Sequence, residues 1–163
     1  MFKKATNNVD LQEVMLDSTI VRAHACAAEY SKDSEKSEGL GRSKGGFTSK
    51  IHALVDALGN PLKFSITGGN RHEIIKAESL MCNIYNTVVI ADKAYDSKKF
   101  RKYLENKNCA HIIPSRRNRK VQYFHDKHIY MERHLIECFF AKLKHFRRIF
   151  SRFDKAKHTL QAY

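Results

Sequence analysis

The sequence predicts an α/β domain built on a mixed sheet. Short runs rich in β-branched and apolar residues, separated by polar turns, indicate five strands. Three other stretches place apolar residues at the spacing of an amphipathic helix. With 163 residues, of which 42% are hydrophobic, the chain is long enough to bury the core of one such domain.

The first three predicted strands form a meander. Residues 1–13 are polar and are expected to be a loose lead-in, and the first strand begins at residue 14 with VMLDSTIVRA. Residues 29–46 combine charges, serines and glycines, which favours a surface loop. The runs KIHALVDA and LKFSITG follow as two strands, and the LGNP between them suits a hairpin turn.

Helices and strands alternate in the next part of the chain. Residues 72–86 repeat apolar side chains at helical spacing, and the run TVVIA that follows indicates a buried strand that ends before Asp92. Residues 97–106 suit a helix that begins at the capping residue Ser97, with Asp96 as a further expected cap.

The end of the chain completes the expected order of elements. CAHIIP is a short strand stopped by its proline, SRRNRK is a basic surface segment, and residues 130–148 form a long helix. The order is therefore βββαβαβα, which is the order of the RNase H-like fold. Fold order alone is weak support for any function.

The charge balance points to a polyanionic partner. Thirty Lys and Arg against seventeen Asp and Glu give a formal net charge of +13 and a pI near 9.7, which favours nucleic acid. A basic protein without such a partner is the alternative. The sequence has no apolar stretch near the roughly 18 residues of a membrane span and no secretory leader at Met1, so we expect a cytoplasmic chain without a membrane partner.

Three acidic residues occupy the places where a metal-dependent enzyme of this fold would need them. Phosphodiester hydrolysis by two Mg²⁺ ions requires hard oxygen ligands that converge. The first strand, the end of the fourth strand and the last helix supply Asp17, Asp92 and Glu137. An acid that interrupts an apolar strand is costly unless it is paired or functional, so Asp17 and Asp92 are informative. A water-exposed strand end is the alternative for either.

The last predicted helix surrounds Glu137 with cations. At about 100° per residue, five polar side chains fall on or at the edge of one stripe. They are Tyr130, Arg133, Glu137, Lys144 and Arg148. Apolar residues fill the adjoining sector, so the helix can dock on a core and offer this stripe to DNA. A salt-bridged surface is the alternative interpretation.

The segment TVVIADKAYDS is followed by a spaced set: Tyr130, two residues, Arg133, three residues, Glu137, six residues and Lys144. This pattern resembles the DDE transposases of bacterial insertion sequences, specifically the insertion-sequence-five group of the broader four/five assemblage. MLDSTIVRAH, GRSKGGFTSKIHALVDALGNPL, the segment near TGGNRHE, and ERHLIECFFAKLKHFRRIFSRFDK also resemble the catalytic domain of that group. The resemblance covers about residues 14–160.

The resemblance implies that residues 14–163 form a catalytic domain that cleaves DNA at transposon ends and joins the 3′ hydroxyl to target DNA. It implies that Asp17, Asp92 and Glu137 are the catalytic triad and bind Mg²⁺, or Mn²⁺ in its place. It also implies DNA contacts from Tyr130, Arg133 and Lys144. Positive charge adds further expected DNA contacts: Arg148, Lys93, Arg116, Arg117 and Arg119. The expected location is the bacterial nucleoid.

Only 16 residues precede Asp17, whereas members of this family usually carry a separate N-terminal DNA-binding region. We therefore expect a second reading frame or a truncated remnant, whose partners are transposon-end DNA, target DNA, and a second copy or the missing N-terminal product. A non-catalytic DNA-binding fragment that acts as a regulator, or an inactive remnant, is the alternative. A housekeeping nuclease for RNA:DNA hybrids is a third interpretation. The triad favours an enzyme, since bare carboxylates would weaken DNA binding.

Overall fold

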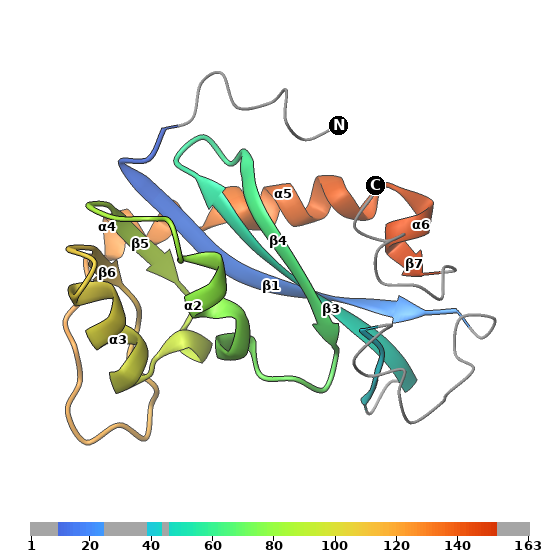
Figure 1. Cartoon of the computed structure of the whole chain (residues 1–163), viewed down its shortest axis with the longest axis horizontal. Helices are drawn as coiled ribbons and strands as arrows, with labels where there is room; N and C mark the ends of the chain where they lie inside the picture. The colour runs from blue at the N-terminus through green and yellow to red at the C-terminus, as the bar shows by residue number, and fades with distance from the viewer. Residues whose placement is uncertain (1–9, 25–38, 44–45, 153–163) are drawn as a thin grey trace.

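The computed structural model describes residues 10–24, 39–43 and 46–152, with the side chains of Ser43, Arg148 and Phe150 outside the description. Within these ranges seven strands join in one sheet (Figure 1). The strands are β1 (Glu13–Ala23), β2 (Gly41–Ser43), β3 (Gly46–Asp56), β4 (Pro61–Gly68), β5 (Val88–Ala91), β6 (Ala110–Ile112) and β7 (Ser151–Arg152).

The sheet has the order β2-β3-β1-β5-β6, with β4 also paired to β3 and β7 paired to β1. β3 is antiparallel to both β1 and β4, whereas β5 and β6 continue the sheet from β1 in parallel. An antiparallel meander extended by parallel strands is the RNase H-like arrangement. The predicted fold class is therefore confirmed.

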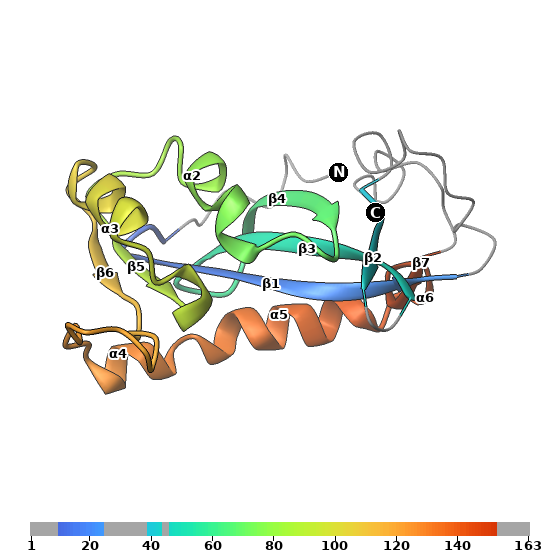
Figure 2. The ribbon, with the colours of Figure 1, turned by 90° about the horizontal axis from the view of Figure 1, so that it is seen from below.

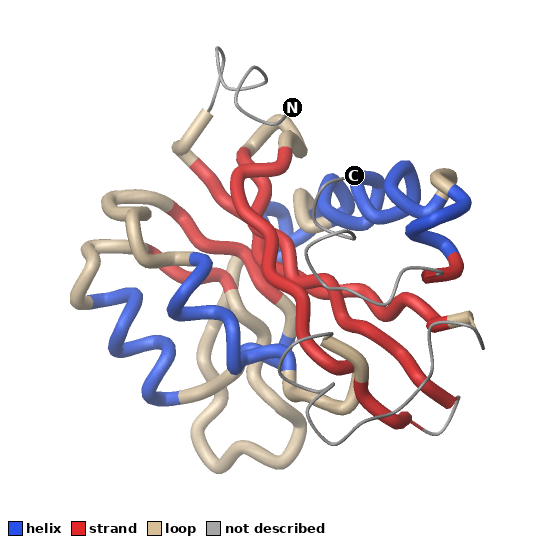
Figure 3. The backbone as a smooth tube through the Cα atoms, turned by 45° about the vertical axis from the view of Figure 1, so that its right-hand side comes forward, coloured by secondary structure: helices blue, strands red, loops and turns tan. Residues whose placement is uncertain are grey.

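Helices cover both faces of the sheet. They are the 3₁₀ turns η3 (Glu73–Lys76) and η4 (Lys93–Tyr95) and the α-helices α2 (Ala77–Leu80), α3 (Lys98–Glu105), α4 (Lys127–Met131), α5 (His134–Lys144) and α6 (Arg147–Phe150). Figures 2 and 3 show α2 and α3 on one face and α5 along the other. The central strand β1 is consequently buried from both sides.

The side chains of β1 alternate between the two faces of the sheet and contribute to two separate core clusters. Val14 and Leu16 contribute to the cluster under α2 and α3, whereas Met15 and Val21 contribute to the cluster under α5. Successive side chains of a strand point to opposite faces. Asp17 shares the parity of Met15 and therefore points to the α5 face.

Three predicted elements differ from the structure. The helix over 72–86 is reduced to η3 and α2, and Asn86 takes a positive φ of 52° that turns the chain into β5. The helix over 130–148 is divided among α4, α5 and α6, and the extended Phe146 (φ −75°, ψ 115°) separates the last two. Part of the loop expected over 29–46 is the strand β2, while residues 25–38 and 44–45 lie outside the described ranges.

α5 docks through its apolar stripe. Ile136 is fully buried and Phe140 nearly so, both in the cluster that contains Met15. The ring of Phe139 stacks on that of Phe64 from β4 at a centroid distance of 5.6 Å. These contacts fix the helix that carries Glu137 against the sheet.

Replacing Ile136 by alanine should lower the free energy of unfolding by about 2–5 kcal/mol, because it leaves a cavity between α5 and the sheet. Urea denaturation measures this change. The matched control is Leu58→Ala, since Leu58 is 61% exposed and its truncation opens no cavity. Equal stability of both variants would contradict the docking of α5 described above.

Candidate active site

Asp17 lies in β1, and Asp92 directly follows the neighbouring strand β5. β5 runs parallel to β1 with Ala91 opposite Leu16, so the next residue, Asp92, comes level with Asp17. Adjacent strands are about 4.8 Å apart, so the two acids lie close together, and the charge of Asp92 acts on Asp17. The local sequence explains this arrangement, because apolar β-branched runs bury both strands and each acid lies at the level where the β1–β5 pairing ends.

Asp17 has an unusual electrostatic environment. It is 8% exposed, and burial raises the pKa of its carboxyl from 3.8 to about 6. The backbone N–H of Ser18, which donates to Oδ1 at 2.8 Å, and the guanidinium of Arg133 oppose this rise. The negative charges of Glu73 and Asp92 add to it. Carboxylates whose negative charges lie close together form a site that favours a bound cation.

Arg133 connects two of the predicted catalytic acids. Its Nη1 donates to Asp17 Oδ2 at 2.6 Å, and its Nη2 donates to Glu137 Oε1 one helical turn away. Its guanidinium carbon also lies 5.9 Å from the ring centroid of Tyr130. Burial, together with the charges of Asp92 and Asp17, raises the pKa of Tyr130 despite the opposing Arg133. The structure therefore brings Asp17, Asp92, Tyr130, Arg133 and Glu137 together.

Glu73 is a further acid near Asp17 that the sequence analysis did not select. It begins η3, contributes to the raised pKa of Asp17, and lies 3.8 Å from Lys50 Nζ. Lys50 is a largely buried residue of β3 and also donates to the carbonyl of Arg71 at 2.8 Å. The sequence feature that could have pointed to Glu73 is the segment TGGNRHE, which contains it and resembles the same family.

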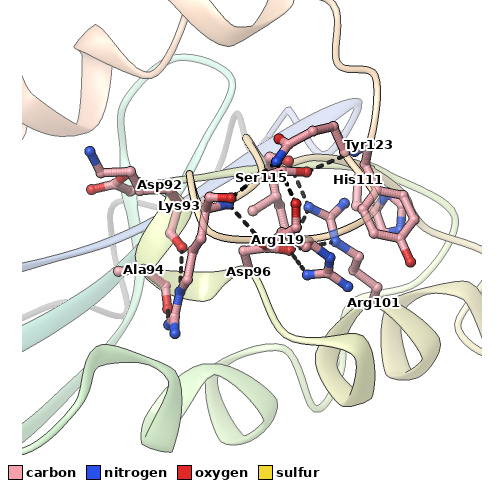
Figure 4. Close-up of polar contacts among 12 residues, drawn as sticks. Asp92, Lys93, Ala94, Asp96, Arg101, His111, Ser115, Arg119 and Tyr123 are labelled. Carbon is pink, nitrogen blue, oxygen red and sulfur yellow. Dashed lines mark hydrogen bonds and ion pairs between the residues drawn. The ribbon is translucent and has the colours of Figure 1, made fainter.

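Asp96 anchors the basic segment rather than capping α3. Its Oδ1 accepts Arg101 Nε and Nη2 at 3.0 and 2.9 Å and also accepts Arg119 Nη1, while Oδ2 accepts the backbone N–H of Arg116 at 2.9 Å (Figure 4). Ser97 begins α3 without a side-chain cap bond. The expectation that Asp96 is a cap is therefore wrong, since nearby arginines outcompete the helix N–H groups for its oxygens.

The Tyr123 ring completes this anchor. Arg101 and Arg119 lie 4.3 and 4.6 Å from its centroid, and its backbone N–H donates to Ser115 Oγ at 2.8 Å. Although burial alone would raise it, the pKa of Asp96 is lowered by Arg119, Arg116 and Arg101. Residues 115–123 are consequently held on the protein at both ends.

The remaining predicted DNA contacts occupy different environments. Arg116 donates from Nη2 to the Ala94 carbonyl at 2.8 Å and from Nε to the Lys93 carbonyl at 3.2 Å. Lys93 and Arg117 are exposed and line a pocket of about 820 Å³ together with Asp92. Lys144 is half-buried in the last turn of α5, and the side chain of Arg148 lies outside the described part.

The donor set matches a hard divalent cation, although the carboxylates are not gathered around one point. Among the described residues, no three His, Cys, Asp or Glu side chains lie close enough to hold a metal ion. Asp17, Asp92 and Glu137 offer only carboxylate oxygens, which Mg²⁺ and Mn²⁺ prefer. The guanidinium of Arg133, a cation, bridges two of them. The residues therefore fit such a metal in the kind of donor that they offer, but not in their present spacing.

Comparisons with known proteins identify the family of this chain. The sequence matches the model of the transposase DDE domain over residues 10–160. The chain therefore belongs to the transposase DDE domain family. Within the described ranges no helix is both long and apolar enough to cross a membrane.

Two relatives are transposases of insertion sequences. The chain is 40% identical over 119 residues to a putative transposase for insertion sequence element IS6501 from Brucella ovis, covering 71% of this chain and 88% of that protein. It is 30% identical over 119 residues to a putative transposase for insertion sequence element IS402 from Burkholderia cepacia, covering 66% and 54%. The match thus spans about half of the second relative.

Two solved transposase structures have a related chain path. A synaptic complex of piggyBac transposase with hairpin DNA has a TM-score of 0.47 at 12% identity, covering 68% of this chain and 24% of that one. A paired-end complex of Mos1 transposase with the left transposon end has a TM-score of 0.41 at 13% identity, covering 62% and 34%. The fold assignment rests on the sheet order.

The stability of metal-free protein should depend on pH through Asp17. Because the native pKa of about 6 exceeds the ordinary 3.8, the native state holds this proton more tightly, and ionisation costs stability as pH rises from about 4 to 6. Asp17→Asn cannot ionise. Its stability relative to wild type should therefore rise by about 2 kcal/mol between pH 4 and pH 7. Urea denaturation in EDTA measures this, and a difference independent of pH would contradict it.

Asp96→Asn should destabilise the protein by about 3–5 kcal/mol, because Arg101, which is 3% exposed, loses its charged partner. Residues 115–123 should also become sensitive to proteolysis. Glu105→Gln, in the helix α3 that carries Arg101, is the matched control, since the Glu105 side chain is 63% exposed and its pair with His111 is a surface contact. Retained protection of the segment in Asp96→Asn would rule out the anchor.

Proposed function

We propose that this chain is a metal-dependent transposase domain that cleaves DNA at the ends of an insertion sequence and joins the 3′ hydroxyl to target DNA. Asp17, Asp92 and Glu137 would hold Mg²⁺, or Mn²⁺ in its place. The level placement of Asp17 and Asp92 on parallel strands, with Glu137 joined to Asp17 through Arg133, is the observation that supports this proposal. We also infer membership of the insertion-sequence-five group, on the spaced set that ends at Lys144.

We propose that the metal supplies charge and that the protein's side chains orient the reacting groups. The bound metal would activate the attacking oxygen and neutralise charge on the leaving oxygen. Asp17 is buried from water and held by the Ser18 N–H, so its carboxylate is oriented before any ligand arrives. Arg133 and Tyr130 lie beside it and can bind the phosphate next to the scissile bond.

The exposed cations extend this site along DNA. Lys93 and Arg117 line the pocket that contains Asp92, and Lys144 lies about two helical turns beyond Glu137. Arg116 and Arg119 serve mainly to hold the segment that presents Arg117. We propose transposon-end and target DNA as partners, together with a second copy or an upstream reading-frame product, in the bacterial cytoplasm at the nucleoid.

Glu137→Gln should reduce cleavage and strand transfer at least about a hundredfold, because an amide is a much poorer ligand for Mg²⁺. The assay uses DNA that bears the element's ends, with Mg²⁺ or Mn²⁺. Glu132→Gln removes an exposed acid close by in the sequence and should behave as wild type.

Equal activity of Glu137→Gln and wild type would refute the triad. Absence of activity in the wild type, with and without the upstream region of the element, would favour a non-catalytic DNA-binding fragment instead.

A further inference from the structure

We propose that Arg133 couples DNA binding to metal binding by exchanging carboxylates for phosphate. In the DNA-free protein its guanidinium holds Asp17 and Glu137. A DNA phosphate then draws the guanidinium away and leaves both carboxylates to the metal. This inference rests on the proposed function, because it takes these two acids as metal ligands.

The contacts of Arg133 are those of a bridge. Two different nitrogens serve two different acids: Nη1 bonds Asp17 Oδ2 at 2.6 Å, and Nη2 bonds Glu137 Oε1. Asp17 and Arg133 are 116 positions apart in the sequence, so this contact joins β1 to the start of α5. An oxygen that accepts an arginine N–H is partly occupied, and a cation between two acids repels a second cation.

The bridge is accessible to a competing anion. The Arg133 side chain is 20% exposed, and the Glu137 side chain is 55% exposed. Lys93 and Arg117 line the neighbouring pocket at Asp92, so a polyanion is attracted to this side of the molecule. Phosphate matches the planar fork of arginine as well as a carboxylate does, and DNA near the acids would otherwise be repelled by them.

The exchange makes the two ligands cooperative. DNA that removes Arg133 from the acids raises their affinity for metal, and by thermodynamic linkage metal raises the affinity for DNA by the same factor. A purely structural salt bridge between α5 and β1 predicts something different. Its loss would weaken folding and leave the metal affinity of the DNA-free protein unchanged or lower.

The test is the affinity for Mn²⁺, measured by the electron paramagnetic resonance of free Mn²⁺, without DNA and with a saturating duplex that bears the element's end. The Mn²⁺ bound by the duplex alone is subtracted. Wild type should bind at least about tenfold more tightly with DNA. Arg133→Gln should already bind at least about tenfold more tightly than wild type without DNA.

Two further variants separate the bridge from simple loss of charge or of folding. Lys142→Gln removes an exposed cation of α5 and should follow wild type. Arg133→Lys keeps the charge but lacks the fork with which two separate nitrogens bond the two acids, so its affinity without DNA should lie between those of wild type and Arg133→Gln. Its Mn²⁺ affinity also tests the proposal if Arg133→Gln does not fold.

In one outcome, wild type binds Mn²⁺ on DNA, but wild type and both Arg133 variants bind it equally weakly without DNA. This result would overturn the coupling and leave the proposed function standing. A gain in Lys142→Gln as large as that in Arg133→Gln would also overturn it. Absence of Mn²⁺ binding in every variant, with and without DNA, would overturn the proposed function itself.

Discussion

The pairing of β1 with β5 is the constraint on which the site depends. Parallel register places Ala91 opposite Leu16, which brings Asp92 level with Asp17 although 75 positions separate them. Both strands are buried by helices on the two faces of the sheet. A slip of one residue would reverse the direction of every side chain and separate the two acids. The apolar packing that holds the register therefore also brings Asp17 and Asp92 together.

Arginine and lysine side chains neutralise acidic residues in three places. Arg133 bonds Asp17 and Glu137, Lys50 lies beside Glu73, and Arg101 with Arg119 neutralises Asp96. The first of these faces the proposed metal site, whereas the last fixes a basic segment at its rim. Buried charges are tolerated only when they are paired in this way. Arginine and lysine side chains thus stabilise the fold by pairing with its partly and fully buried acids.

Much of this arrangement could be predicted from local sequence. The apolar runs around Asp17 and before Asp92 predicted two strands, with Asp17 inside the first and Asp92 directly after the other, as the structure has them. The Arg133–Asp17 contact could not be predicted from spacing, since it depends on how α5 crosses the sheet. Asp96 was misjudged because a capping position in the sequence gave no sign of Arg119, which arrives from a distant segment. The length of the last helix was overestimated, because its periodicity continues through the extended Phe146.

The most direct test of the account is anomalous X-ray diffraction from crystals of this chain bound to DNA and soaked in Mn²⁺. The account predicts an anomalous peak in contact with the carboxylates of Asp17 and Asp92, with Glu137 released from Arg133 and turned toward the same ion. A DNA-bound structure in which Mn²⁺ lies elsewhere, or in which Arg133 still bridges Asp17 and Glu137 beside an empty site, would contradict it.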